Sequence, residues 1–337
     1  MSRRRVALMG CGGTISASAR TRGFVVADLL TAAYGIQEQL PPDLAVSAWD
    51  YDLRSSTEWS LADAFELVEA VAATVEAGDL VGVAITFGTG TLEEVAYLAQ
   101  LTLTPRVPVV FTASMYPHGH PRSDGAANLL DALLVAASDV PPGVYVVLQG
   151  EIHDPGAVAK VHASDMRAFR SLELGPLGRI EDGRPWLLRT PRTTRSLRPA
   201  ALNARVELVK CYLGMGTAQL RGLFREGTDG LVVESLASGQ VPPHLLEPLA
   251  ALSGDGVAVA ISTRCPSGRL RLHESFPVGF AGSEKDLLGM GALPTFEPGT
   301  KARIRLLVGL SAGLTGDELA AWLRDGDPRT ALGRQEA

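Results

Sequence analysis

The segment LVGVAITFGTGTLEEVAYLAQL, residues 80–101, carries the strongest fold signal in the chain. Its apolar run at 80–86 predicts a buried strand, and the periodic stretch that follows predicts an amphipathic helix. Between the two, Gly88 and Gly90 flank Thr89, so a small hydroxyl stands at the carboxyl end of the strand. A strand that leads directly into such a helix is the repeating unit of a parallel sheet covered by helices.

Two helices of the first half carry recognisable start signals. Thr91 and Glu94 stand in capping-box register, and Ser60 and Asp63 form a similar pair before a second periodic stretch that Gly78 closes. Short apolar runs continue to alternate with amphipathic stretches along the chain. Further strands are expected at 6–9, 44–49, 107–111, 144–148, 205–210, 230–233 and 257–261, and the last helices at 298–310 and 316–325.

A change of composition divides the chain. The stretch RPWLLRTPRTTRSLRPAALNA, residues 184–204, is rich in Arg, Pro and Thr and lacks periodicity, which is typical of an interdomain connection. We therefore expect an N-terminal α/β domain over 1–190, a linker over 191–204 and a smaller C-terminal α/β domain over 205–337. In sheets of this kind, ligands bind at loops after the strands, so the loops that follow Met9, Thr86 and Phe111 are the places to search.

Composition excludes several classes of protein. The 337 residues are 46% hydrophobic and 20% charged, which excludes intrinsic disorder, and a net charge of −6 gives little basis for nucleic-acid binding. The three cysteines, Cys11, Cys211 and Cys265, support neither a disulfide framework nor a zinc site. No run approaches the roughly 20 apolar residues of a membrane span. We expect a soluble, cytoplasmic protein without a metal ion or a membrane partner.

Three further loops carry candidate chemistry. GCGGTIS, residues 10–16, places the Thr14 hydroxyl directly after the first strand, although an ordinary glycine turn would look the same. Its spacing fails as a dinucleotide fingerprint. In FTASMYPHGHPRSDGAANLL, residues 111–130, the residues before the helix are expected to cap it. Lys160, in AVAKVHASDMRAFRS, is by itself most simply a solvated charge.

Taken together, these segments resemble the L-asparaginase family of bacterial and archaeal type over nearly the whole chain. GGTI at 12–15 matches the first family signature, and FGTGTLEE at 87–94 is similar to the second, HGTDTxEE. TASMYPHGHPRSDGAANLLDA and KVHASDMRAFRSLELGPLG are similar to two further family segments, as are ESLASGQVP and ISTRCPSGRL in the second half. The resemblance implies a two-domain α/β fold with a larger, flavodoxin-like N-terminal parallel sheet and no cofactor. It also implies a homodimer or homotetramer with sites at the subunit interface.

The resemblance also implies roles for individual residues. Thr14 is the expected nucleophile, which attacks a carbonyl carbon to give an acyl-enzyme. Thr89 and Lys160 match the second threonine and the lysine beside the substrate. Ser56 matches the serine that holds the substrate's α-carboxylate, with Ser55 or Thr57 as alternatives.

The residues expected to surround the reacting carbonyl group come from both halves of the chain. Gly88 belongs to the second signature, and the amide of Thr89 and the backbone near Ala113 are expected to face the developing oxyanion. A neighbouring subunit is expected to contribute Ser238, which replaces a family asparagine, and Glu274, the nearest candidate acid.

Three departures from the family pattern bear on specificity. Gly90 replaces the aspartate that grips the substrate's α-ammonium and pairs with the lysine. Phe24 replaces the tyrosine of the lid segment, and Phe87 replaces a histidine at a position expected to serve packing. Without a carboxylate at position 90, we expect Lys160 to lack a neighbouring carboxylate, so that burial favours its neutral form, which suits a general base.

These features predict an amidohydrolase or acyl-transfer enzyme with a small-molecule substrate: an amide, lactam or ester without a free α-ammonium. A modified amino acid, a peptide or an intermediate of specialised metabolism would qualify, and free L-asparagine would be hydrolysed weakly or not at all. The alternative is an asparaginase-fold binding or regulatory protein that has lost catalysis. The related tRNA-linked amidotransferase subunit is less expected, because it carries a further domain before the GGT motif. Arg122, Arg167 and Arg170 are expected to be solvated surface rather than contacts to an anionic substrate.

Overall fold

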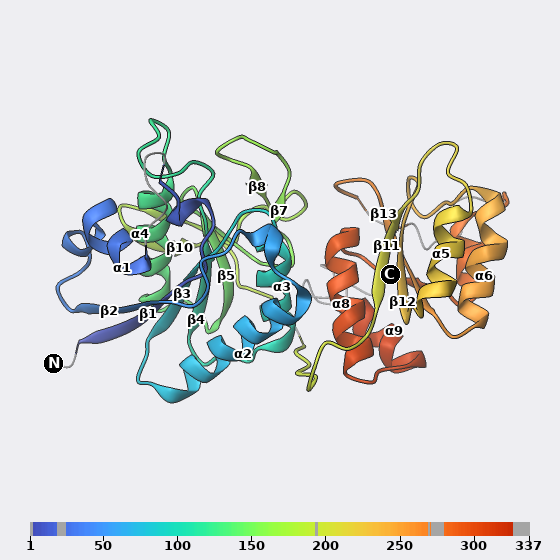
Figure 1. Ribbon diagram of the computed structural model, residues 1–337, viewed down its shortest axis with the longest axis horizontal. Helices are drawn as coiled ribbons and strands as arrows, with labels where there is room; N and C mark the ends of the chain where they lie inside the picture. The colour runs from blue at the N-terminus through green and yellow to red at the C-terminus, as the bar shows by residue number, and fades with distance from the viewer. Residues whose placement is uncertain (1–2, 19–24, 193–194, 269, 271–279, 326–337) are drawn as a thin grey trace. The chain divides into compact units, whose positions relative to one another are not determined.

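The computed structural model describes residues 3–18, 25–192, 195–268, 270 and 280–325. The chain forms two compact units, Met1–Arg192 and Thr193–Ala337 (Figure 1). Among the described residues, no helix has the length and apolar character needed to cross a bilayer.

The first unit is built on an eight-stranded sheet in the order β10-β9-β6-β5-β4-β3-β1-β2. The five strands from β2 to β5 are parallel, whereas β6, β9 and β10 add an antiparallel edge. A separate antiparallel pair joins β7 to β8. The strands are β1 (Arg4–Gly10), β2 (Leu44–Asp50), β3 (Gly82–Thr86), β4 (Pro108–Thr112), β5 (Gly143–Leu148), β6 (Glu151–His153), β7 (Ala159–Lys160), β8 (Phe169–Arg170), β9 (Gly178–Glu181) and β10 (Arg184–Leu187).

Helices cover both faces of this sheet. In Figure 1, α1 and α4 lie on one face and α2 and α3 lie on the other. The strands between these layers are almost fully buried, which explains their continuous apolar runs. The helices are α1 (Val26–Asp28), α2 (Leu61–Ala77), α3 (Leu92–Thr102) and α4 (Gly125–Ala136), with short helical turns η1 (Thr14–Ser16), η2 (Leu29–Ala33), η3 (Ile36–Glu38) and η4 (Ser56–Glu58).

The second unit contains a four-stranded parallel sheet in the order β11-β12-β13-β14. In Figure 1, α5 and α6 lie on one face of this sheet, and α8 and α9 on the other. Its elements are β11 (Val206–Lys210), α5 (Ala218–Glu226), β12 (Gly230–Ser235), η5 (Pro243–Leu245), α6 (Leu246–Gly254), β13 (Ala258–Thr263), α7 (Glu284–Gly289), β14 (Leu293–Pro294), α8 (Gly299–Ser311) and α9 (Gly316–Arg324).

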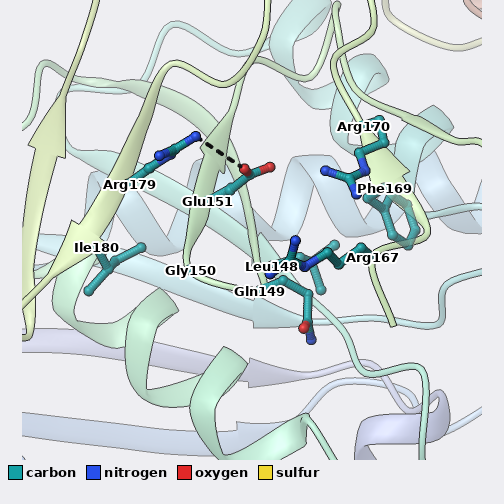
Figure 2. A pocket seen from close by; sticks show the side chains of 9 residues that line it. All are labelled: Leu148, Gln149, Gly150, Glu151, Arg167, Phe169, Arg170, Arg179 and Ile180. Atoms are coloured by element: carbon teal, nitrogen blue, oxygen red, sulfur yellow. Dashed lines mark ion pairs between the residues drawn. The ribbon is translucent and has the colours of Figure 1, made fainter. Parts of the chain in front are cut away.

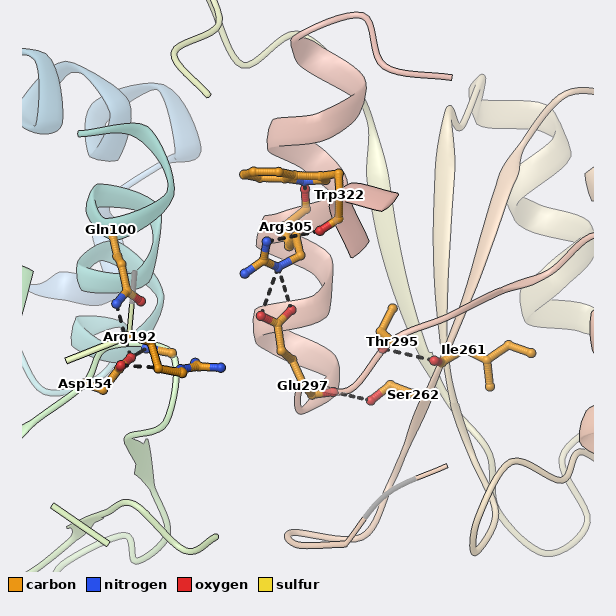
Figure 3. A network of polar contacts seen from close by, with 10 residues as sticks. Gln100, Asp154, Arg192, Ile261, Ser262, Thr295, Glu297, Arg305 and Trp322 are labelled. Carbon is orange, nitrogen blue, oxygen red and sulfur yellow. Dashed lines mark hydrogen bonds and ion pairs between the residues drawn. The ribbon is translucent and has the colours of Figure 1, made fainter. Parts of the chain in front are cut away.

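A buried polar network stabilises the packing of α8 against α9 (Figure 3). The Arg305 guanidinium donates to the Glu297 carboxylate at 2.9 Å and lies 4.8 Å from the ring centre of Trp322. The Trp322 indole N–H donates back to the Arg305 carbonyl at 2.8 Å. A buried ion pair offsets the cost of its desolvation only when further hydrogen bonds satisfy its groups. The contacts to Trp322 therefore help to offset the desolvation of the Arg305–Glu297 pair. In the first unit, the same figure shows Gln100 donating to Asp154 at 3.2 Å.

The structure confirms the α/β architecture and the predicted strands that form the parallel part of the sheet. The Ser60–Asp63 capping box is also present, and α2 ends immediately before Gly78. The capping box predicted for Thr91 is wrong: its side chain makes no cap bond and donates instead to the Ser56 carbonyl at 3.0 Å.

The antiparallel edge of the first sheet was not predicted. Residues 184–187, at the start of the Arg- and Pro-rich stretch, form strand β10, which pairs with β9. Side chains on this short strand alternate between exposed and half-buried positions. The apolar run that marks a buried strand is therefore missing there.

Candidate active site

Three loops lie side by side at the carboxyl ends of β1, β3 and β4. The Cys11 amide donates to the Thr86 carbonyl at 3.0 Å, and the Phe87 amide donates to the Thr112 carbonyl at 2.8 Å. These bonds continue the strand pairing beyond the last residue of each strand. The loops that follow are therefore held together at one edge of the sheet, as expected for a ligand site in a parallel sheet.

Glycines bring the first two loops into direct backbone contact. Gly13 adopts a φ of 78°, and a Cβ there would lie 2.5 Å from the Gly88 Cα. Only glycine combines this left-handed conformation with so close an approach. Thr14, the next residue, begins η1 and is half-buried. The Thr14 and Thr89 loops are thus in contact, although the two residues are far apart in the sequence.

Ser56 lies beneath the second loop. It is 5% exposed, and its hydroxyl accepts a hydrogen bond from the Gly90 amide at 3.1 Å. A Cβ on Gly88 would lie 2.5 Å from the same hydroxyl. The two alternatives for this position have other partners: the hydroxyls of Ser55 and Thr57 lie 2.9 Å apart, and Ser55 caps η4. Ser56 is therefore the hydroxyl that the fold places under Gly90.

Lys160 reaches the second threonine from strand β7. Its Nζ donates to the Thr89 Oγ1 at 2.9 Å. Burial lowers the pKa of Lys160 below the ordinary lysine value, while the negative charge of Glu93 opposes this shift. The lysine is therefore easier to deprotonate than a solvated one, which confirms the expected direction.

The expectation that Lys160 lacks a neighbouring carboxylate is wrong. Glu93 Oε2 accepts a hydrogen bond from the Lys160 backbone amide at 2.8 Å. Glu93 lies in the first turn of α3, where the helix dipole favours a negative charge. Sequence reasoning missed this contact, although Glu93 belongs to the quoted FGTGTLEE motif.

The loop after β4 is fixed by Asp124. Its carboxylate accepts hydrogen bonds from the backbone amides of Met115 and Tyr116, both at 3.0 Å. It also accepts from Asn128 Nδ2, which in turn donates to the Ala113 carbonyl at 2.9 Å. Asp124 precedes α4 but makes no side-chain cap, so the expected capping role is wrong. Ala113 itself is fully buried beside this network.

Four other residues were singled out from the sequence. Phe24 and Glu274 fall outside the described residues. Ser238 belongs to the second unit, where its hydroxyl accepts from Gln240 Nε2 at 3.3 Å. Phe87 is fully buried and packs edge-on against Trp59, with ring centres 4.9 Å apart, which agrees with a packing role.

The assembled group, which we call the threonine site, comprises Thr14, Ser56, Thr89, Gly90 and Lys160. It offers hydroxyls, a loop amide that donates to Ser56 and one amine of lowered pKa. Such a set can deliver a nucleophile and move a proton. Among the described residues, no group of three or more His, Cys, Asp or Glu side chains is placed to hold a metal ion.

Comparison with known proteins places the chain among asparaginases. Residues 5–193 match the family model described as "Asparaginase, N-terminal", and residues 205–323 match "Glutaminase/Asparaginase C-terminal domain". The chain is 29% identical to an L-asparaginase of Bacillus licheniformis over 92% of its own length and 96% of that protein. It is 36% identical to a probable L-asparaginase of Deinococcus radiodurans over 72% and 75% of the two chains.

The similarity extends to a second kind of protein and to a solved structure. One subunit of the glutamyl-tRNA(Gln) amidotransferase of Methanobrevibacter smithii is 28% identical over 81% of this chain and 65% of that protein. The crystal structure of a probable cytoplasmic L-asparaginase from Campylobacter jejuni shares the fold, with a TM-score of 0.82, 24% identity and coverage of 96% and 99% of the two chains. Fold, loop geometry and both family models agree, and the chain therefore belongs to the asparaginase family.

Proposed function

We propose that this protein hydrolyses an amide, lactam or ester through an acyl-enzyme on Thr14. The observation that carries the proposal is the 2.9 Å contact between Lys160 Nζ and Thr89 Oγ1 on a loop packed against the one that bears Thr14. A threonine hydroxyl is a weak nucleophile at neutral pH and needs a nearby base. A lysine whose pKa is lowered by burial supplies one.

In the proposed reaction, the Thr14 oxygen attacks the carbonyl carbon and its proton passes towards the Thr89–Lys160 pair. Backbone amides of the loops that bear Thr89 and Ala113 stabilise the negative charge on the carbonyl oxygen. The C–N bond, or the C–O bond of an ester, then breaks, and the leaving group departs with a proton. Attack by water on the acyl-Thr14 intermediate regenerates the hydroxyl; attack by another nucleophile would instead give acyl transfer.

Position 90 determines the substrate class that we propose. In this chain, the residue between the two threonines is Gly90, whose amide donates to Ser56. A charged hydrogen bond to an ammonium contributes about 1.5–3 kcal/mol, and Gly90 has no side chain to form one. We therefore propose a substrate whose α-nitrogen is acylated or otherwise uncharged, and weak or no activity on free L-asparagine. Ser56 remains in place for the α-carboxylate.

We further propose that the protein is a homodimer or homotetramer whose sites lie at a subunit interface, with Ser238 and Glu274 of the second unit serving a neighbouring copy. The support is membership of a family in which such assemblies are typical. Light scattering at micromolar concentration tests the assembly. A monomer at concentrations where turnover is full would contradict it.

The nucleophile is tested by the variant Thr14→Ala. Thr31→Ala is the matched control, because Thr31 is an exposed helical threonine whose hydroxyl donates to the Ala27 carbonyl one turn earlier. The substrates are a panel of N-acylated asparagine and glutamine derivatives, and ammonia release is the readout. We expect Thr14→Ala to abolish release with an unchanged melting temperature, and intact-mass analysis of quenched wild-type protein to find one acyl group on Thr14.

The alternative, a binding protein that has lost catalysis, predicts no ammonia from any member of the panel and no adduct. Gly90 is the observation that favours it, because one family carboxylate is absent. Ammonia release that survives in Thr14→Ala would instead contradict the assignment of the nucleophile.

A further inference from the structure

A polar pocket lies at the antiparallel side of the first unit, and none of the residues that line it belongs to the threonine site (Figure 2). Its volume is about 330 Å³. The side chains that define it, which we call the arginine pocket, come from the β5–β6 turn, from β6, from the segment that ends in β8 and from β9. They are Gln149, Glu151, Arg167, Phe169, Arg170 and Arg179.

The β5–β6 turn that lines this pocket is held in place. Gln149 and Gly150 have φ values of 55° and 71°, which is the geometry of a tight hairpin turn. The Gln149 amide donates to Asn128 Oδ1 at 2.9 Å, and its side chain donates to Asp124 at 3.0 Å. Glu151 follows directly on β6. The turn is therefore a preformed part of the site.

The charges in the pocket do not balance. Figure 2 shows Arg167 and Arg170 extending into it from one side and Arg179 from the other, with Glu151 between them. The distance from Arg179 Nη2 to Glu151 Oε1 is 4.0 Å. In the part of the chain that the structure describes, the guanidinium groups of Arg167 and Arg170 have no hydrogen-bond or ion-pair partner. Among the side chains that line the pocket, three positive charges thus face one negative charge. Asp131 adds a carboxyl that accepts from the Gly150 amide. Because Arg167 and Arg179 are exposed, solvent screens part of the repulsion that an anion would relieve.

The buried residue behind Glu151 adds no charge of its own. His153 is 1% exposed, and its Nε2 lies 3.6 Å from Glu151 Oε2. Burial, together with the positive charges of Arg170 and Arg189, lowers the pKa of His153 to about 4. The imidazole is therefore neutral near pH 7. It neither adds to nor offsets the positive charge of the pocket.

The arrangement selects the chemistry of a ligand. A guanidinium binds a carboxylate through two parallel hydrogen bonds, and this pocket presents such groups on two opposing walls. A volume of about 330 Å³ is at the small end of ligand pockets. We propose that the arginine pocket binds a small dicarboxylate, with one carboxylate between Arg167 and Arg170 and the other at Arg179. A monocarboxylate has only one such group and would leave one wall unpaired.

Isothermal titration with succinate, at about 0.15 M salt so that exposed charges are screened, tests this proposal on the full chain. We expect one succinate per chain. Arg170→Gln and Arg179→Gln should each weaken binding roughly tenfold to a hundredfold, the loss of one charge-assisted pair. Arg184→Gln is the matched control, because it removes an exposed arginine from the neighbouring strand β10 and lies outside the pocket.

Three results would overturn the proposal: no heat with succinate, binding that survives the Arg170→Gln/Arg179→Gln double variant, or binding of phosphate or acetate as tight as that of succinate. Arg170→Lys keeps the charge without the planar fork and should give an intermediate affinity. Melting temperatures equal to wild type establish that the variants are folded. Because the readout is heat of binding, the test does not depend on the proposed hydrolysis.

Discussion

The threonine site and the arginine pocket belong to the same unit but are built in opposite ways. The threonine site is made of loop backbone held by glycines, and among its five residues the only charged side chain is Lys160. The arginine pocket is lined by long charged side chains on short antiparallel strands and on the turn before β8. The first arrangement holds small groups rigidly, as covalent chemistry requires, whereas the second provides charge for recognising an anion.

Two structural links join these regions. Strands β7 and β8 pair so that Lys160 stands opposite Phe169, which lines the arginine pocket. Gln149, also in the pocket lining, donates to Asp124, whose carboxylate holds the loop after β4. The variants described next separate the contribution of individual residues in and beside these two regions to activity, stability and specificity.

The largest expected effect is that of Lys160→Met on turnover. A general base contributes about 10²- to 10⁴-fold, so kcat for an N-acylated amide should fall by that factor. Because the proposed base is the deprotonated Lys160 amine, wild-type activity should rise with pH through a lysine pKa that lies below the ordinary value, and this limb should vanish in the variant. Lys285→Met, on an exposed residue of α7, is the control. A pH–rate profile that is unchanged in Lys160→Met would contradict the role.

Next in size is the effect of His153 on stability. Its pKa is lowered from 6.5 to about 4, so the unfolded chain binds the proton first as pH falls. The free energy of unfolding should therefore decrease from pH 6.5 to pH 4, by on the order of 3 kcal/mol from this group. His153→Asn keeps a polar partner for Ser171 and should flatten that slope in urea titrations. An equally steep slope in the variant would show that other groups cause it.

Gly90→Asp is expected to change specificity. A carboxylate there would gain about 1.5–3 kcal/mol with an α-ammonium, which corresponds to roughly 10- to 150-fold in kcat/KM for L-asparagine. The new Cβ would lie 2.9 Å from Ser56 Oγ, so that hydroxyl must rotate. Gly90→Asn has the same shape without the charge and should give no such gain. Equal gains from both variants would point to shape rather than charge.

The smallest effect is expected from Glu93→Gln. The amide oxygen still accepts from the Lys160 backbone, but the negative charge that favours protonated Lys160 is gone. The pKa of Lys160 should fall further, and the rising limb of the pH–rate profile should move to lower pH by less than about one unit. A shift to higher pH would reverse the assigned influence of Glu93.

The sequence predicts the loops of the threonine site better than it predicts the arginine pocket. The parallel strands and the Gly–Thr–Gly loop are local patterns: buried strands read as apolar runs, and glycines mark close backbone approach. Ser56 was expected only through the resemblance to the family, with Ser55 or Thr57 as alternatives, and its place under Gly90 was not predicted.

The arginine pocket was out of reach because it depends on pairing between short strands. Strands β6, β8 and β9 span only three, two and four residues, and they carry no apolar periodicity. Arg167 and Arg170 were expected to be solvated surface; Arg167 is exposed, whereas Arg170 is half-buried, and both line the pocket. The Glu93 contact to Lys160 was missed for a similar reason: it joins residues 67 positions apart through a turn that no local pattern encodes.

The most direct test of the account is the ratio of kcat/KM for Nα-acetyl-L-asparagine to that for L-asparagine in the wild-type protein, measured by ammonia release. Because Gly90 has no side chain to pair with an α-ammonium, the proposed site should favour the acetylated substrate by about tenfold or more. A wild-type protein that hydrolyses free L-asparagine faster than the acetylated form would contradict the account.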